Sequence, residues 1–140
     1  MTESRTSTAE DRFVAHGVLG EIRGDRIVFK IPETDYQLEL VAAEKVVASP
    51  GERIAGTIRA QARRIDVIRS GGRYIEPVNG RPRRVQGRIV DIDTTKSTVT
   101  VNAVVPIVCR TNDLQSAEQF EVGQLVSFDV TSGATFTPML

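Results

Sequence analysis

Apolar and polar residues alternate along much of the chain. Ile27, Phe29 and Ile31 are separated by single residues that are less apolar or polar, and Val99, Val101 and Ala103 repeat this arrangement. A period of two residues is typical of a β-strand that buries one face. We therefore expect strands in both regions, with these side chains in the core.

The same pattern of residues occurs twice. Residues 17–22 match residues 87–92 at an offset of 70, and the strand at residues 27–31 matches the one at 99–103 at an offset of 72. The offset of 72 also relates Gly51, Ile54, Gly56, Ile58 and Ala62 to Gly123, Val126, Phe128, Val130 and Ala134. A match over several segments predicts an internal duplication, with about five short strands in each half.

Five short strands per half are typical of a small barrel. We expect an all-β fold of two tandem, five-stranded antiparallel barrels of the OB type, packed together. Residues 114–119, capped by Asn112 or Asp113, and residues 42–47 are helix-prone segments that fit between the third and fourth strands. One continuous β-sandwich or a pair of SH3-like barrels stays open as an alternative, because periodicity does not give strand order.

Turn signals divide the chain into three predicted parts. Residues 1–11 have no apolar period and are expected to form a disordered tail. The first barrel is expected at residues 12–78, with an extra central hairpin at about 63–78 around Ser70-Gly71-Gly72. A turn at residues 79–82 precedes the second barrel, at residues 82–140.

The register of the strands predicts the core. Its expected members in the first barrel are Ile27, Phe29, Ile31, Ile54 and Ile58, and in the second Val99, Val101, Val126, Phe128 and Val130. Thr100 is expected on the opposite, exposed face.

Composition narrows the class of protein. Val (18), Ile (11) and Thr (13) make up 42 of the 140 residues, which favours strands and excludes an all-helical protein. The formal charge of zero and 40% apolar residues exclude a disordered chain and a histone-like polycation. One cysteine, no secretion signal and no long apolar stretch predict a cytoplasmic protein without a membrane partner. The oligomeric state stays open.

Charge is uneven along this neutral chain. Residues 59–88 contain nine arginines and two acidic residues, a difference of +7, whereas residues 1–58 and 89–140 carry −3 and −4. Guanidinium groups bind phosphates bidentately and stack on bases. This arginine belt therefore indicates either a surface for a polyanion or ion pairs across the interface between the barrels.

Residues 120–130 (Phe-Glu-Val-Gly-Gln-Leu-Val-Ser-Phe-Asp-Val) resemble the penultimate strand of cold-shock and related OB-fold domains. The resemblance implies an OB-type barrel. The aromatic RNA-binding strands of the cold-shock family have no counterpart in residues 97–103, so their function is not carried over.

Residues with catalytic potential are few. His16 and Cys109 are read as structural residues, and the chain has no motif for a nucleophile, a metal or a phosphate-binding loop. We expect no enzyme, no cofactor and no metal, but a non-catalytic binding module for single-stranded nucleic acid or another polyanion. The alternative is a structural or protein–protein interaction module with the arginines at an inter-barrel or oligomer interface. The candidate nucleic-acid-binding residues are Arg59, Arg63, Arg64, Arg69, Arg73, Tyr74, Arg81, Arg83, Arg84 and Arg88.

Overall fold

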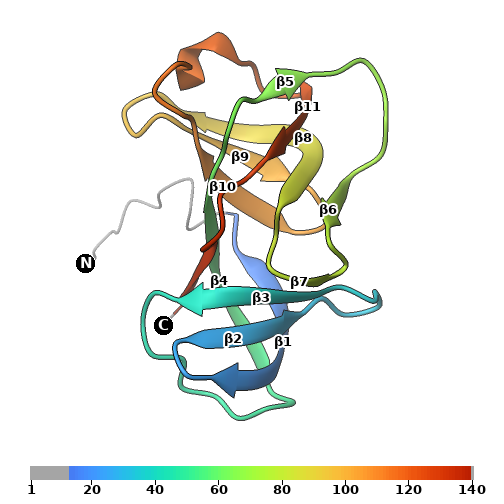
Figure 1. Cartoon of the computed structure of the whole chain (residues 1–140), viewed down its shortest axis with the longest axis vertical. Coiled ribbons are helices and arrows are strands. Elements are labelled where there is room, and N and C mark those ends of the chain that lie inside the picture. The colour runs from blue at the N-terminus through green and yellow to red at the C-terminus, as the bar shows by residue number, and fades with distance from the viewer. Residues whose placement is uncertain (1–12, 140) are drawn as a thin grey trace, which may run out of the picture.

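The computed structural model describes residues 13–139, so the predicted tail at residues 1–11 lies outside the described residues. This part of the chain folds into twelve strands and one short 3-10 helix (Figure 1). The strands are β1 (Ala15–Arg23), β2 (Arg26–Lys30), β3 (Gln37–Ala42), β4 (Arg53–Gln61), β5 (Asp66–Val67), β6 (Tyr74–Glu76), β7 (Asn79–Gly80), β8 (Arg84–Asp93), β9 (Thr98–Asn102), β10 (Pro106–Arg110), β11 (Leu125–Asp129) and β12 (Thr135–Pro138), and the helix is η1 (Ala117–Gln119). The prediction of an all-β fold is confirmed.

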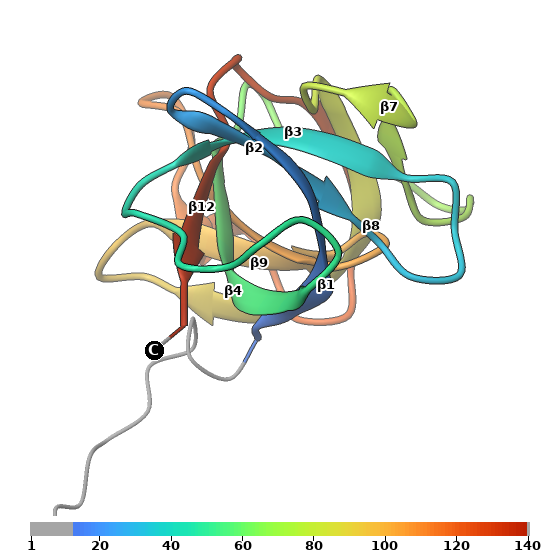
Figure 2. The ribbon, with the colours of Figure 1, turned by 90° about the horizontal axis from the view of Figure 1, so that it is seen from below.

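Five strands form a closed barrel in the order β1, β2, β3, β12 and β4, with β4 pairing back onto β1. Figure 2 shows these strands from the end of the barrel. The pairing of β3 with β12 is parallel and the others are antiparallel. The barrel is therefore mixed, and the prediction of a purely antiparallel barrel is wrong. Sequence alternation could not show this, because it is the same for both strand directions.

The fifth strand of the barrel comes from the C-terminal end of the described residues. Phe136 on β12 packs against Phe29 on β2, with ring centroids 5.4 Å apart, and both side chains are fully buried. The barrel thus takes strands from both sides of the turn near residue 80. Strand β12, which follows this turn in the sequence, pairs with β3 and β4, which precede it. The division of the chain into two domains at the turn stays a prediction.

The other seven strands lie outside this barrel. β8 pairs with β9 and β11, and β9 pairs with β10, which lies parallel to the end of β4. Figure 1 shows β4 running lengthwise between the barrel and these strands. The described residues show one closed barrel and not the two that we predicted.

The predicted hairpin at residues 63–78 is wrong. β5 pairs with β11 and β6 pairs with β8, so the two strands in this segment do not pair with each other. The physical reason is that the backbone groups of β5 and β6 are hydrogen-bonded to different strands, β11 and β8. Ser70-Gly71-Gly72 is therefore part of the loop that connects β5 to β6 and not a tight hairpin turn.

The predicted core is confirmed at nine of its ten positions. All ten expected side chains are buried apart from Ile54, which is half-buried and packs against the core. Thr100, however, is only 2% exposed, so its predicted exposure is wrong. Ser127 and Gln86 are also buried, at 3% and 7% exposed. The outer face of these strands is therefore covered as well as the inner one.

The two helix-prone segments give little helix. Ser116, rather than Asn112 or Asp113, caps η1, and its side chain accepts a hydrogen bond from the Glu118 amide in a capping box with Gln119. Residues 42–47 contain no helix.

Candidate functional site

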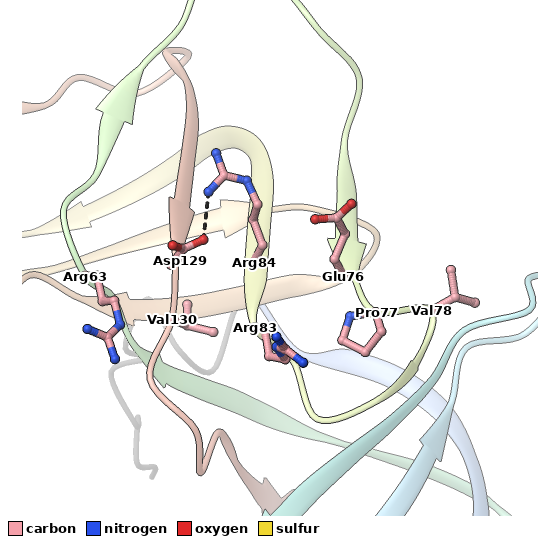
Figure 3. A pocket seen from close by; sticks show the side chains of 8 residues that line it. All are labelled: Arg63, Glu76, Pro77, Val78, Arg83, Arg84, Asp129 and Val130. Atoms are coloured by element: carbon pink, nitrogen blue, oxygen red, sulfur yellow. Dashed lines mark hydrogen bonds and ion pairs between the residues drawn. The ribbon is translucent and has the colours of Figure 1, made fainter.

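An open groove of about 740 Å³ lies beside the point where the ends of β4 and β11 meet (Figure 3). It is lined by Arg63, Glu76, Pro77, Val78, Arg83, Arg84, Asp129 and Val130. Three of the ten predicted site residues therefore lie in one groove. With three arginines and two carboxylates, the groove has a formal charge of +1.

Backbone pairing sets the order of the charged side chains. Asp129 is opposite Arg84 on β8, and Arg84 is opposite Glu76 on β6. On the other side of Asp129, its carbonyl accepts a hydrogen bond of 2.8 Å from the Arg63 amide. Because directly opposed residues project to the same face of a sheet, the four side chains form a row of alternating charge.

Arg84 is the fixed member of this row. Its guanidinium donates hydrogen bonds to Asp129 Oδ1 at 2.7 Å and to Ser127 Oγ at 2.8 Å. The Asp129 carboxylate, followed by the Tyr74 hydroxyl, raises the pKa of the Arg84 guanidinium by accepting hydrogen bonds from it. Arg84 thus holds Asp129 in place and neutralises it.

Arg63 and Arg83 are held differently, by their backbones alone. The Arg83 amide donates to the Glu76 carbonyl at 2.7 Å, and the Arg83 carbonyl accepts from the Val130 amide at 3.0 Å. Both side chains are exposed, and neither has a side-chain hydrogen bond or ion pair with any residue from 13 to 139. They are free to contact a ligand on either side of residues 129–130.

The structure disperses the other predicted site residues over several surfaces. Arg64 pairs with Asp66 at 3.0 Å, Arg81 lies 3.8 Å from Glu39 on the barrel, and Arg88 donates to the Gly123 carbonyl at 2.8 Å. Arg59, Arg69, Arg73 and Tyr74 likewise do not line the groove. The ten predicted residues therefore do not all line one groove.

Sequence reasoning missed three charged residues that matter for the geometry. Glu76 and Asp129 lie among the arginines of the groove, and Arg110 lines a second pocket together with Arg59. The period of two between Arg59, Gln61 and Arg63 was a usable signal for a common face. No local signal could have found Arg110, because it reaches β4 only through the pairing of β10.

His16 and Cys109 lie in different environments. His16 is exposed on β1, and Cys109 is fully buried on β10, where desolvation raises the pKa of its thiol far above the usual range. Within residues 13–139, no group of three or more His, Cys, Asp or Glu side chains could hold a metal ion. In the same range, no helix has the length and hydropathy to span a membrane.

Comparison with known proteins adds no relative. No protein-family model, curated protein or solved structure matches this chain. What the groove can bind is therefore inferred from its own residues.

Proposed function

We propose that this protein is a non-catalytic binding module for single-stranded nucleic acid or another polyanion. One observation carries the proposal: Arg63 and Arg83 have free guanidinium groups on either side of residues 129–130, in the groove of about 740 Å³. A guanidinium presents a planar fork of donors that matches two phosphate oxygens. Two such forks, one on each side of residues 129–130, can hold two phosphates of one chain.

The third arginine of the groove plays a positioning role in this proposal. Arg84 already donates hydrogen bonds to Asp129 and Ser127. Only its remaining N–H groups can donate to a ligand. Asp129 opposes anion binding, and its pairing with Arg84 limits that opposition. Glu76 is exposed at the far end of the row and repels anions there.

The groove also indicates how a nucleic acid would be recognised. No aromatic side chain among residues 13–139 lines it. Binding without stacking depends on phosphates, so it is expected to be insensitive to base sequence and sensitive to salt.

Fluorescence anisotropy with labelled single-stranded DNA and RNA tests the proposal. Wild type, Arg63→Ala/Arg83→Ala and the matched control Arg69→Ala/Arg73→Ala are compared at low and high salt. All four substituted side chains are exposed and lack partners in the described residues. We expect salt-sensitive binding by wild type and the control, and a large loss of affinity in the groove variant. Equal losses in the two variants, or no binding by wild type at low salt, would contradict the proposal.

A structural or protein-interaction module is the second candidate. It is favoured by the arginines that have partners within the chain, above all Arg59, which donates to Thr137 Oγ1 on β12 at 2.8 Å, and Arg81 beside Glu39 on β3. On this alternative, wild type does not bind the oligonucleotides and Arg59→Ala lowers the melting temperature.

We also infer a finer description of the fold, with two OB-like rings from an internal duplication. The first ring is the closed barrel, with β12 in the place of its fifth strand. The second would be formed by β8, β9, β10, the end of β4 and β11, linked by the bridge between Ala62 and Val130. Both first hairpins have an irregularity at the matching point, between Leu19 and Glu21 and between Ile89 and Asp91.

Amide hydrogen exchange tests the second ring. The Arg63 and Thr131 amides donate to the carbonyls of Asp129 and Gln61, at 2.8 and 2.9 Å, on either side of the bridge. A closed ring predicts strong protection of both amides. Exchange as fast as in the loop at residues 69–73 would contradict the inference.

A further inference from the structure

A second pocket, of about 310 Å³, lies on the outer face of β4, β9, β10 and β12. It is lined by Arg59, Ala60, Gln61, Thr98, Val108, Arg110, Thr131, Gly133 and Thr135. Two arginines and three threonines line it, and no carboxylate among residues 13–139 does. The described lining residues carry a formal charge of +2, against +1 in the first groove.

The polar groups of this pocket are arranged to receive an anion. The Arg110 side chain is exposed and has no hydrogen bond or ion pair with the described residues. The hydroxyl groups of Thr98, Thr131 and Thr135 are likewise without a hydrogen-bond partner in residues 13–139. Arg59 is held at the wall by its bond of 2.8 Å to Thr137 Oγ1.

The side chain of Gln61, which also lines the pocket, is held by hydrogen bonds. Its side-chain amide donates to the carbonyls of Ala62, Arg110 and Thr111, at 2.9, 3.2 and 3.3 Å. The contact with Arg110 ties β10 to β4 beside the pocket. The two arginines therefore sit on strands whose relative position is set by hydrogen bonds.

Strand pairing connects this pocket to the first groove. The Thr131 amide donates to the Gln61 carbonyl, and the Arg63 amide donates to the Asp129 carbonyl. Gln61 and Thr131 line the second pocket, whereas Arg63 and Asp129 line the first groove. The two pairs are successive same-facing rungs of one antiparallel ladder, so they are about 7 Å apart.

We propose that the second pocket is a further phosphate subsite and that an extended polyphosphate backbone crosses from it to the first groove. This inference rests on the proposed function and deepens it. Arg59 and Arg63 are four residues apart on one strand face, or about 13 Å. Arg110 is paired with Gln61, two residues before Arg63 and on the neighbouring strand, so Arg110 and Arg63 contact different phosphates of one chain. The ligand class is a chain of repeated phosphates, which single-stranded nucleic acid and inorganic polyphosphate both provide.

Ligand length separates the two subsites experimentally. The probes are a labelled dinucleotide and a labelled single strand of about 10 nucleotides, within the span that one OB fold covers. Arg110→Ala should weaken binding of the longer strand several-fold and reduce its salt slope by about 0.7, the effect of one lost phosphate contact. The dinucleotide is too short to contact both sites at once, so Arg110→Ala should weaken its binding less than it weakens binding of the longer strand. Arg69→Ala, which removes an exposed arginine elsewhere, is the matched control.

The outcomes distinguish this inference from the proposed function. If Arg63→Ala/Arg83→Ala weakens binding of the longer strand but Arg110→Ala does not, the second subsite is excluded and the proposed function stands. If wild type binds neither probe at low salt, both are contradicted. Inorganic polyphosphate of similar length should displace the longer strand, because phosphates make the contacts. Failure to displace it would overturn recognition through phosphates alone.

Discussion

Asp129 is the residue that most directly sets the charge of the candidate site. Its carboxylate lies between Arg63 and Arg84 in the cross-strand row and forms an ion pair with Arg84 at 2.7 Å. A bound phosphate would have to compete with this carboxylate for Arg84 and would be repelled by it. Asp129 should therefore weaken the anion binding that we propose for the groove.

Replacing Asp129 by asparagine should strengthen polyanion binding. The amide keeps the size of the side chain, removes one negative charge and releases Arg84 for a phosphate, so the affinity for a single strand should rise several-fold at low salt. The ion pair is solvent-exposed, at 38% and 58% of the two side chains, so stability should fall by about 1 kcal/mol or less.

Anisotropy titrations and thermal melts measure both effects of Asp129→Asn. Asp66→Asn is the control, because Asp66 pairs with Arg64 outside the groove and its loss should leave affinity unchanged. Weaker binding by Asp129→Asn would show that Arg84 acts only as a structural partner.

Phe128 tests the core at the same scale. It is 1% exposed, and Phe128→Ala should lower the free energy of unfolding by about 3–5 kcal/mol, because it removes a buried aromatic ring and leaves a cavity. Val47→Ala, at a position 88% exposed, should change stability by less than about 0.5 kcal/mol. Denaturant melts compare the two, and similar losses would contradict the register.

Cys109 gives a chemical test of burial. Desolvation raises the pKa of its thiol, so the sulfur stays protonated and inaccessible at mildly alkaline pH. A thiol reagent should therefore not modify the folded protein, whereas it should react fully in denaturant. Rapid modification without denaturant would mean that β10 is less well packed than described.

At the scale of elements, the close approach of β12 to β4 depends on a glycine. A Cβ on Gly56 would lie 2.2 Å from the Thr137 carbonyl oxygen and 2.7 Å from the Phe136 ring. β12 is the strand that completes the barrel, and backbone atoms cannot move aside as a flexible side chain can. Gly56 is therefore a steric requirement for barrel closure.

Gly56→Ala should lower the free energy of unfolding by about 1–3 kcal/mol or more, because inserting atoms into a tightly packed site usually costs that much. Gly72→Ala is the matched control, because a Cβ there meets no atom within 4 Å and the residue has no positive φ. Thermal melts and protection of the β12 amides from hydrogen exchange measure the result. If the two variants were equally stable, β12 would not be docked on β4 as described.

The elements also show what alternation can and cannot predict. Ile27, Phe29 and Ile31 reveal their buried face because side-chain direction in a strand is local. Pairing partners are non-local, so nothing around Phe136 indicates that it packs against Phe29 in the barrel. The strands at residues 66–67 and 79–80 contain two residues each and are too short to show any period. The predicted exposure of Thr100 is wrong because alternation shows which face of the strand a side chain is on, but not whether other residues cover that face.

At the scale of the whole molecule, the arginine belt was a partial guide to the site. The +7 segment contains Arg63, Arg83 and Arg84 of the groove, but most of its other arginines are turned to separate surfaces or paired within the chain. Arg110 belongs to the acidic C-terminal segment by sequence and to the second pocket by fold. Charge counted along the sequence locates a basic segment, but strand pairing determines which charged side chains become neighbours in the fold.

Binding of a polyanion at Arg63 and Arg83 can be followed by nuclear magnetic resonance of the arginine side chains. The Nε–Hε signals are followed at low salt while a short single-stranded DNA is added. We expect the signals of Arg63 and Arg83 to shift progressively. Those of Arg64, paired with Asp66, and of Arg69, outside the groove, should stay in place. No shift of any arginine signal, or shifts confined to Arg64 and Arg69, would contradict binding at Arg63 and Arg83.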